Sequence, residues 1–266
     1  MNERCAETDS PMMEQKIAVA ASRKRLLYAL IPEAPQLKYE SAGIGDTCVY
    51  TISEGGISAV VSDIHGLRLR PERRNIAAHQ GVLNRLMEFT TPLPMAFGTI
   101  ADCAAAVREM LACNLDAISK QLNRVAGKAE MILRVKWDVP NIFEYFVLTH
   151  RELMLARDRL FGTDCDPSQD DKLEIGRLFE RLLEEEREAL TEKVEKAVSG
   201  YGSKVKRNKC RNELEVMNLA CLVPRESLTT FEDRVLQAAR PFDNNFAFDY
   251  NGPWPPYNFV ELSLEL

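Results

Sequence analysis

The strongest constraint in the sequence is a regular alternation of side chains between residues 131 and 137. Large apolar residues occupy every second position, and the residues between them are mostly basic: Met131, Leu133, Val135 and Trp137 alternate with Ile132, Arg134 and Lys136. Successive side chains of a β-strand point to opposite faces, so this pattern predicts a strand with one buried face. The second half of the chain therefore opens with a sheet that another layer covers.

The residues after this strand extend the prediction to a whole domain. The apolar spacing predicts, in chain order, a helix at about 138–160, a long helix at about 172–198, a strand at 214–223, a helix at 228–239 and a strand at 246–250. The order β-α-α-β-α-β is a modified ferredoxin-like, or split βαβ, plan with an inserted helix. In such a plan the helices cover one face of an antiparallel sheet.

The sequence of the first half of the chain predicts a second domain that contains both strands and helices. The pattern gives strands at 26–31, 48–53 and 57–62, a helix at 71–89, a strand at 92–100 and a helix from about 102 to 125. Gly55 and Gly56 suit a tight hairpin, Asp102 suits a helix N-cap, and Gly127 is a natural helix stop. We therefore predict an α+β protein of two domains, 23–127 and 128–251.

Charge supports this division and limits the kind of partner. The first 127 residues carry 14 basic and 14 acidic side chains, whereas the remainder carries 20 and 26, so the net charge of −6 comes from the second half. Proteins that bind nucleic acid or anionic membranes by long-range attraction need a basic footprint. We therefore expect neither nucleic acid nor a lipid membrane as a partner.

The two ends of the chain differ from the body. Residues 1–22 show no period, and we expect a disordered leader there. Residues 252–266 combine Pro253, Pro255 and Pro256 with aromatic residues, and prolines cannot pair along both edges of a sheet. We expect this tail to lie extended and to pack back on the body through the rings of Trp254, Tyr257 and Phe259.

Cysteine usage and hydropathy indicate the compartment. The seven cysteines are scattered without a CxxC pair, which fits neither a disulfide framework nor a zinc site. No apolar run approaches the roughly 18 residues that span a bilayer, and residues 17–21 are too short for the core of a signal peptide. We expect a soluble, intracellular protein.

His79 is the best placed of the three histidines for acid–base chemistry. It lies at helical spacing from Ile76 and Leu83, on the same side as Arg73 and Arg74 one turn earlier. A partly buried imidazole suits a structural residue as well as a general base, and we favour the structural role. The sequence holds no metal-ligand, nucleophile-elbow or phosphate-loop motif, so we predict no catalytic residue, no metal and no cofactor.

Two charged features of the second half leave alternatives open. Residues 204–211 hold five basic side chains, which we interpret as a solvated loop before a strand rather than as a site for an acidic partner. Glu186 falls on the apolar stripe of the long helix, where an unpaired carboxylate is costly to bury. Either it forms a buried ion pair, or the helix outruns its domain there. We favour the second interpretation, and expect residues 190–210 to be mobile or to contact another chain.

An ordered set of short blocks resembles a known family. The blocks are Arg73-Arg74-Asn75-Ile76 through His79 to Val82-Leu83, then Pro92-Leu93-Pro94 with Phe97-Gly98-Thr99, then Gly127-Lys128 leading into Val135-Lys136-Trp137-Asp138, and finally Pro253 to Phe259. Spread over about residues 24–262, this set resembles the gas vesicle protein L/F family. The leader and the basic segment near Lys204 lie outside the pattern.

The resemblance implies a minor protein of gas vesicles, the gas-filled protein shells that make some prokaryotes buoyant. It implies two α+β domains, the second with a modified ferredoxin-like fold, and no enzymatic activity. It further implies binding of the hydrophobic shell protein, gas vesicle protein A, which prevents its aggregation during vesicle nucleation, and association with other minor gas vesicle proteins. The protein is then cytoplasmic before assembly and a trace component of the shell afterwards.

Covering an aggregating shell subunit requires exposed apolar area with a polar rim, or an open strand edge. The candidate partner-binding residues are Trp254, Tyr257 and Phe259, with Arg73 and Arg74 as basic neighbours. The rings serve equally to dock the tail, in which case the client uses a sheet edge or the groove between the domains. The alternative function is a small-ligand or acid–base module centred on His79. A monomer is plausible on this sequence.

Overall fold

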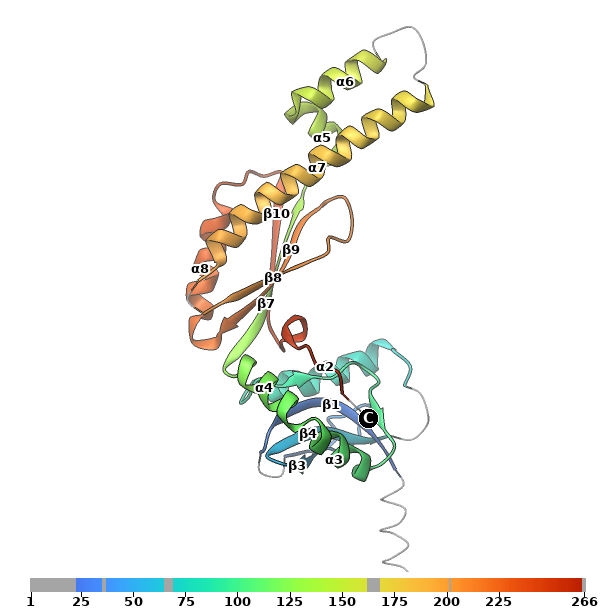
Figure 1. Cartoon of the computed structure of the whole chain (residues 1–266), viewed down its shortest axis with the longest axis vertical. Coiled ribbons are helices and arrows are strands. Elements are labelled where there is room, and N and C mark those ends of the chain that lie inside the picture. Colours follow the sequence, from blue (N-terminus) through green and yellow to red (C-terminus); the bar gives the residue numbers. More distant parts are fainter. Residues whose placement is uncertain (1–22, 35–36, 65–68, 162–167, 201, 265–266) are drawn as a thin grey trace, which may run out of the picture. The chain divides into compact units, whose positions relative to one another are not determined.

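The structure is a computed structural model that describes residues 23–34, 37–64, 69–161, 168–200 and 202–264 (Figure 1). It divides into two compact units, each containing a sheet and helices. Unit 1 takes in Met1–Ala129 together with Trp254–Leu266, and unit 2 takes in Glu130–Pro253. The α+β class predicted from the sequence is confirmed. The expected leader, residues 1–22, lies outside the described residues.

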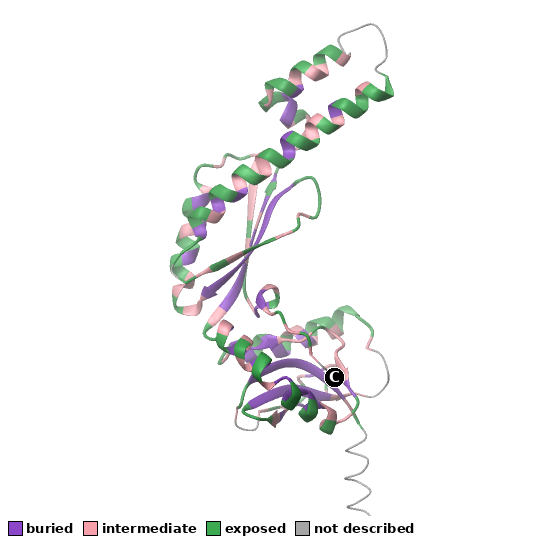
Figure 2. Cartoon of the chain, viewed as in Figure 1, coloured by how far each residue is buried: buried purple, intermediate pink, exposed green. Residues whose placement is uncertain are grey.

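Unit 1 is built on a mainly antiparallel sheet with a strongly apolar centre. Its strands are β1 (Lys24–Pro32), β2 (Lys38–Tyr39), β3 (Val49–Glu54), β4 (Ile57–Ile64), β5 (Leu93–Pro94) and β6 (Ile100–Ala101). The order is β2-β3-β4-β1-β5, and β6 also pairs with β1. The β3–β4 hairpin turns at Gly55 and Gly56, whose φ angles of 58° and 83° explain the two glycines. The central strands β1 and β4 are almost wholly buried (Figure 2).

Three helices of unit 1 pack their apolar stripes against this sheet. They are α2 (Arg73–Met87), α3 (Ala104–Cys113) and α4 (Leu115–Val125). Val82, Leu83 and Leu86 of α2 join the buried residues of β1 and β4 in one core. The N-cap of α3 is Cys103, whose sulfur accepts a hydrogen bond from the Ala106 amide, and not Asp102 as expected. Asp102 instead forms an ion pair with Lys24, at 2.8 Å.

Unit 2 contains a four-stranded sheet with two long helices on one face (Figure 1). Its elements are β7 (Lys128–Trp137), α5 (Ile142–Thr149), α6 (Arg151–Phe161), α7 (Gln169–Val198), β8 (Lys204–Asn208), β9 (Glu215–Pro224), α8 (Leu228–Ala239) and β10 (Phe246–Trp254). The strand order is β10-β7-β9-β8, so β8 and β10 are the edges. Short 3-10 turns lie at Arg225–Ser227 and, in the tail, at Tyr257–Phe259.

Two expectations for unit 2 are wrong in detail. The basic segment expected to be a loop contains strand β8, which pairs antiparallel with β9 from Lys204↔Leu222 to Asn208↔Asn218. An edge strand needs little apolar content, because much of it faces solvent. The expected helix at 138–160 is two helices, because His150 between α5 and α6 has an extended conformation. The observed order is thus β-α-α-α-β-β-α-β, and the ferredoxin-like assignment stays a prediction.

The long helix α7 also differs from its expected course. Its C-terminal half does not leave the domain, because Thr191, Val194 and Val198 are buried and the two valines belong to the core of unit 2. The N-terminal half of α7 instead packs with α5 and α6. Glu186 lies between these halves and pairs with His150, at 3.1 Å. The ion-pair interpretation of Glu186 was therefore the better one.

Candidate functional site

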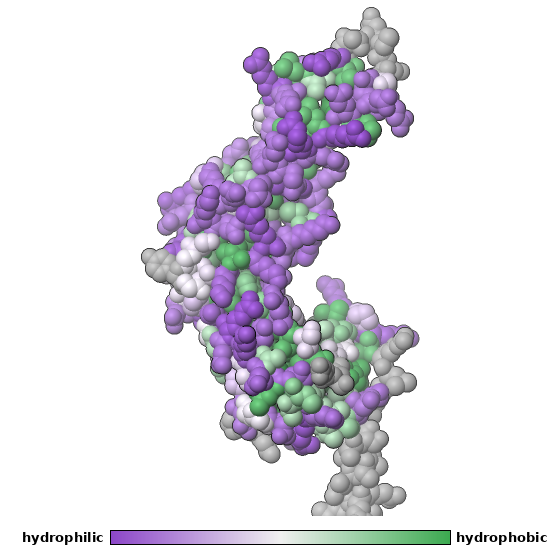
Figure 3. Space-filling view, viewed as in Figure 1, coloured by the Kyte–Doolittle hydropathy of each residue, from purple (hydrophilic) through white to green (hydrophobic). Residues whose placement is uncertain are grey.

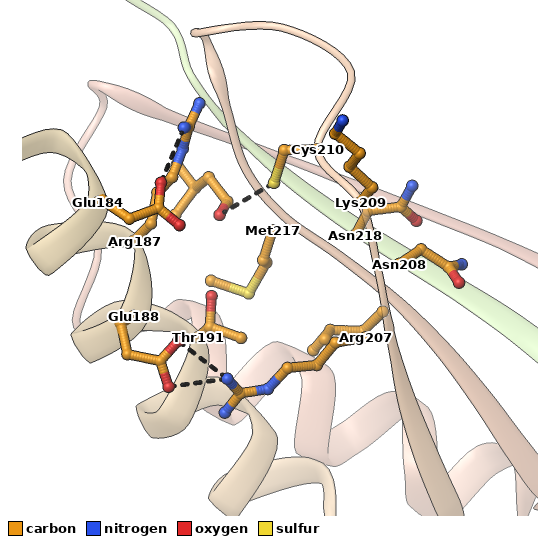
Figure 4. Close-up of a pocket in the computed structure, with 12 residues that line it drawn as sticks. Glu184, Arg187, Glu188, Thr191, Arg207, Asn208, Lys209, Cys210, Met217 and Asn218 are labelled. Atoms are coloured by element: carbon orange, nitrogen blue, oxygen red, sulfur yellow. Dashed lines mark hydrogen bonds and ion pairs between the residues drawn. The ribbon is translucent and has the colours of Figure 1, made fainter. Parts of the chain in front are cut away.

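A cavity of about 300 Å³ with both charged and apolar lining residues lies in unit 2 between α7 and the β8–β9 pair (Figure 4). α7 contributes Glu184, Arg187, Glu188 and Thr191, and the strand side includes Arg207 and Met217. Figure 3 shows this part of the chain as largely hydrophilic, in keeping with the acidic sequence of α7. Acidic and basic side chains from the helix and from the strands gather around this cavity.

Arg207 bridges the cavity from β8 to α7. Its guanidinium donates to both carboxylate oxygens of Glu188, at 2.8 and 3.0 Å, and to Glu195, at 2.8 Å. These two carboxylates raise the pKa of Arg207 further. The sequence placed Arg207 in a solvated loop, whereas the structure shows that it anchors the edge strand to the helix.

Arg187 forms a second link on the other side of the cavity. It donates to the backbone carbonyls of Asn212, Glu213 and Glu215, at distances between 2.9 and 3.0 Å. Its guanidinium also lies over the ring of Trp137, 5.7 Å from the centroid. A planar guanidinium with five donors suits this task, and a lysine could not make all the contacts. Arg187 thus fixes the β8–β9 connection to the helix layer.

The groups around the cavity suit packing and ion pairing rather than covalent chemistry. Burial raises the pKa of the Cys210 thiol, which lines the cavity, and raises that of Cys221, in the core of unit 2, to about 12. Both thiols therefore stay protonated at neutral pH. Within the described residues there is no group of three or more His, Cys, Asp or Glu side chains that could hold a metal ion. What the cavity offers is room beside a sheet edge.

His79 lies in the core of unit 1, apart from the arginines. It is 4% exposed, stacks on Tyr28 with 5.2 Å between ring centroids, and meets Phe97 edge-on. Burial lowers its pKa, and Nε2 has no hydrogen-bond partner in the described residues. Arg73 and Arg74 are exposed on the first turn of α2, where Arg74 pairs with Glu72 at 2.9 Å. The expected proximity of these arginines to His79 is therefore wrong, and His65 lies outside the described residues.

The tail packs on the helices of unit 1. Phe259 is buried at 4% exposure, whereas Trp254 is half-buried and Tyr257 is 43% exposed. The Tyr257 hydroxyl donates to Oε1 of Gln80 on α2, at 3.3 Å. The Gln121 amide of α4 donates to the Glu261 carbonyl, at 2.9 Å. Trp254, Tyr257 and Phe259 thus differ in accessibility, which the sequence alone did not separate.

The face of α2 that bonds to the tail also carries an exposed apolar side chain. Ile76 is 48% exposed, although the sequence placed it on the buried stripe, and it precedes Gln80 by one helical turn. Residues four apart on a helix share a face, so Ile76 lies on the side of α2 that Tyr257 reaches through Gln80. Arg73 is exposed and lies three residues before Ile76 on the same face of α2. We call Ile76, Gln80 and Tyr257 the α2–tail surface.

The sequence left an ion pair open for Glu186 but did not identify His150 as its partner. His150 stacks on Phe146 with 4.7 Å between centroids, and its Nδ1 is 3.0 Å from the Thr149 hydroxyl. Burial raises the pKa of Glu186, and the neighbouring His150 opposes that shift. The two residues lie 36 positions apart, and nothing in the sequence between them indicates their contact, so only the fold brings them together.

Comparison with known proteins places these observations in a family. The fold defines an α+β protein of two compact units. The family model described as gas vesicle synthesis protein GvpL/GvpF matches residues 24–261. The chain belongs to this family, as the resemblance indicated, and a role in gas vesicle formation follows. No helix within the described residues has the length and apolarity that a membrane span requires.

Individual relatives agree with the family over nearly the whole chain. Gas vesicle protein F of Dolichospermum flosaquae is 24% identical over 239 residues, covering 89% of this chain and 97% of the relative. Gas vesicle protein F1 of Halobacterium salinarum is 25% identical, covering 89% and 92%. The crystal structure of GvpF from Anabaena sp. PCC7120 matches with a TM-score of 0.81 at 23% identity, covering 91% of this chain and all of that one. These relatives carry the names of gas vesicle proteins and not of enzymes.

Proposed function

We propose that this protein binds the hydrophobic shell subunit, gas vesicle protein A, and keeps it from aggregating while a vesicle nucleates. The observation that carries the proposal is the α2–tail surface, where Ile76 and Tyr257 stay about half exposed in a family devoted to gas vesicle synthesis. A shell subunit exposes apolar area before assembly, and such area aggregates unless it is covered. Covering the apolar area of the shell subunit requires no covalent bond to form or break. The proposed function is therefore binding, without a catalytic step.

The composition of the surface fits an apolar client with limited affinity. Ile76 and the Tyr257 ring supply apolar area, and Gln80 and Asn84, linked at 3.0 Å, supply a polar rim with Arg73. Tyr257 is well suited to such a contact because its ring is large and has few rotatable bonds. A client held this way can still be released to the growing shell. Other minor gas vesicle proteins are further partners under this proposal, and the protein passes from the cytoplasm to the vesicle.

The test is co-expression of the tagged full chain with gas vesicle protein A, followed by pull-down. The double variant Ile76→Ser/Tyr257→Ser should lose most of the co-purified shell protein, and should no longer reduce light scattering when shell protein is diluted from denaturant. Leu236→Ser is the matched control, because Leu236 is an exposed apolar residue of unit 2, on α8.

Two results would count against the proposal at different levels. Full retention of shell protein by the double variant would reject the α2–tail surface as the binding site. Absence of shell protein from the pull-down with the unmodified chain would reject the binding function itself.

A further inference from the structure

The β8 edge of the second sheet is the most regular open edge in the described part of the chain. β8 ends the strand order, and the pairing described for it is with β9. The other edge, β10, contains Pro253, which has no backbone N–H to offer. The edge strands β2 and β5 of unit 1 have only two residues each. An edge with unpaired N–H and C=O groups is a template for another extended segment.

The two faces of β8 have different chemistry. Val205 packs against the core of unit 2, and Arg207 reaches Glu188 and Glu195 on α7, so both point toward the helix layer. Side chains alternate along a strand, and Lys204 and Lys206 therefore point to the opposite face. Both are exposed. A segment that pairs with β8 meets two lysines on one face and the helix layer on the other.

The cavity described above lies on the helix side of this edge. Arg207 of β8 lines it, together with Thr191 and Met217 (Figure 4). A strand added beside β8 would direct every second side chain to this side, where about 300 Å³ is open. Glu184 and Glu188 line that side and pair with Arg187 and Arg207, and Lys209 lines it as well. An uncharged side chain fits there without disturbing these ion pairs.

We infer that β8 and this cavity form an acceptor site for an extended, acidic segment of a partner protein, which adds to the sheet as a fifth strand. Its acidic side chains lie opposite Lys204 and Lys206, and the intervening uncharged side chain enters the cavity. Backbone hydrogen bonds hold the segment, and the alternating side chains select it. Lysines on an edge also repel basic strands, including β8 of a second copy, so the site discriminates by charge. The α2–tail surface plays no part in this site.

The experiment uses the full chain and two synthetic seven-residue peptides, one alternating glutamate with valine and one alternating lysine with valine. Fluorescence anisotropy should detect binding of the glutamate peptide and none of the lysine peptide. Lys204→Glu/Lys206→Glu should weaken that binding by about tenfold or more, since two favourable pairs become repulsive. Lys120→Glu/Lys172→Glu is the matched control, because it makes the same charge change at exposed lysines elsewhere.

Amide hydrogen exchange separates strand addition from simple attraction. Saturating glutamate peptide should slow exchange by about tenfold at those amides of residues 204–208 that point away from β9, because these edge N–H groups become hydrogen-bonded. Binding without this protection would overturn the inference, since it would show a charged surface without strand pairing. Equal competition by single-stranded oligothymidine would overturn it as well, by indicating a general polyanion site. Lack of glutamate-peptide binding at millimolar concentration would do the same.

Discussion

His79 shows how far helical spacing carries a prediction for one residue. Its spacing from Leu83 correctly put it on the buried side of α2, and it is 4% exposed. Its actual neighbours, Tyr28 and Phe97, come from β1 and from the segment between β5 and β6. Those contacts depend on strand pairing between segments far apart in sequence, which spacing within one helix does not encode. The arginines next to it in sequence are exposed instead.

The buried His79 should make unit 1 sensitive to mild acid. Burial lowers its folded pKa below the ordinary value of 6.5, so the unfolded chain binds the proton more readily. The contribution of neutral His79 to the free energy of unfolding is therefore fully present above pH 6.5. It is lost as the pH falls from 6.5 toward the folded pKa. His79→Phe keeps an aromatic ring beside Tyr28 without a titrating nitrogen. We expect urea midpoints of this variant to fall less between pH 7.5 and pH 5.5 than those of the unmodified chain.

The quantity to compare is the change of the urea midpoint with pH in each chain, and not the midpoint at any one pH. His79→Phe can shift stability at every pH through packing alone, and that shift cancels in the slope. Identical slopes for the two chains would show that His79 does not control the acid response.

Among the secondary structure elements, predictability followed apolar content. Strands β1, β3, β4, β7 and β9 and helices α2, α7 and α8 lie close to their expected ranges, because each buries a periodic set of apolar residues. β8 escaped prediction because Val205 is its one apolar residue, and its stability comes from β9 and from the Arg207 ion pairs. The interruption between α5 and α6 at His150 contains no glycine or proline that would have predicted it. Sequence reasoning misses the elements that are stabilised by neighbouring segments of the chain rather than by a periodic set of their own apolar residues.

Glu186 in the middle of α7 should cost stability when it is ionised. Burial raises its folded pKa above the ordinary 4.5, so its stabilising contribution is complete below pH 4.5 and is lost as the pH rises through the folded pKa. Glu186→Gln keeps an oxygen that can accept from His150 and cannot ionise. We expect this variant to be at least as stable as the unmodified chain at pH 7.5, with the difference shrinking toward pH 4.

Glu185→Gln serves as the control for this prediction in urea or thermal unfolding. Glu185 is exposed and pairs with Arg181 at the surface, so its neutralisation should change stability little at either pH. A marked loss of stability in Glu186→Gln at pH 7.5, absent from Glu185→Gln, would mean that attraction to His150 outweighs the cost of burial.

For the whole chain, the sequence suggested a division near Gly127 and a separate tail after residue 251. The contact pattern divides the chain between Ala129 and Glu130 and assigns Trp254–Leu266 to unit 1. Prolines and aromatic rings indicated that the tail packs on the body, but nothing in their pattern indicated where. The choice depends on Phe259 and on partners such as Gln80 and Gln121, which lie in helices more than 100 residues earlier. Unit 1 is therefore built from both ends of the chain.

This discontinuous unit predicts that neighbouring tail residues have separable roles. Phe259 is buried, so Phe259→Ala should lower the free energy of unfolding of unit 1 by about 3 kcal/mol. Tyr257 is 43% exposed, so Tyr257→Ala should cost less than about 1 kcal/mol in stability. Under the proposed function, Tyr257→Ala should still reduce recovery of shell protein, because its ring belongs to the binding surface. Urea unfolding and pull-down on the same two variants measure both effects. If Tyr257→Ala destabilised unit 1 as much as Phe259→Ala, any loss of binding would be a consequence of unfolding. Tyr257 would then stabilise the fold of unit 1 and would not be a contact residue for the shell protein.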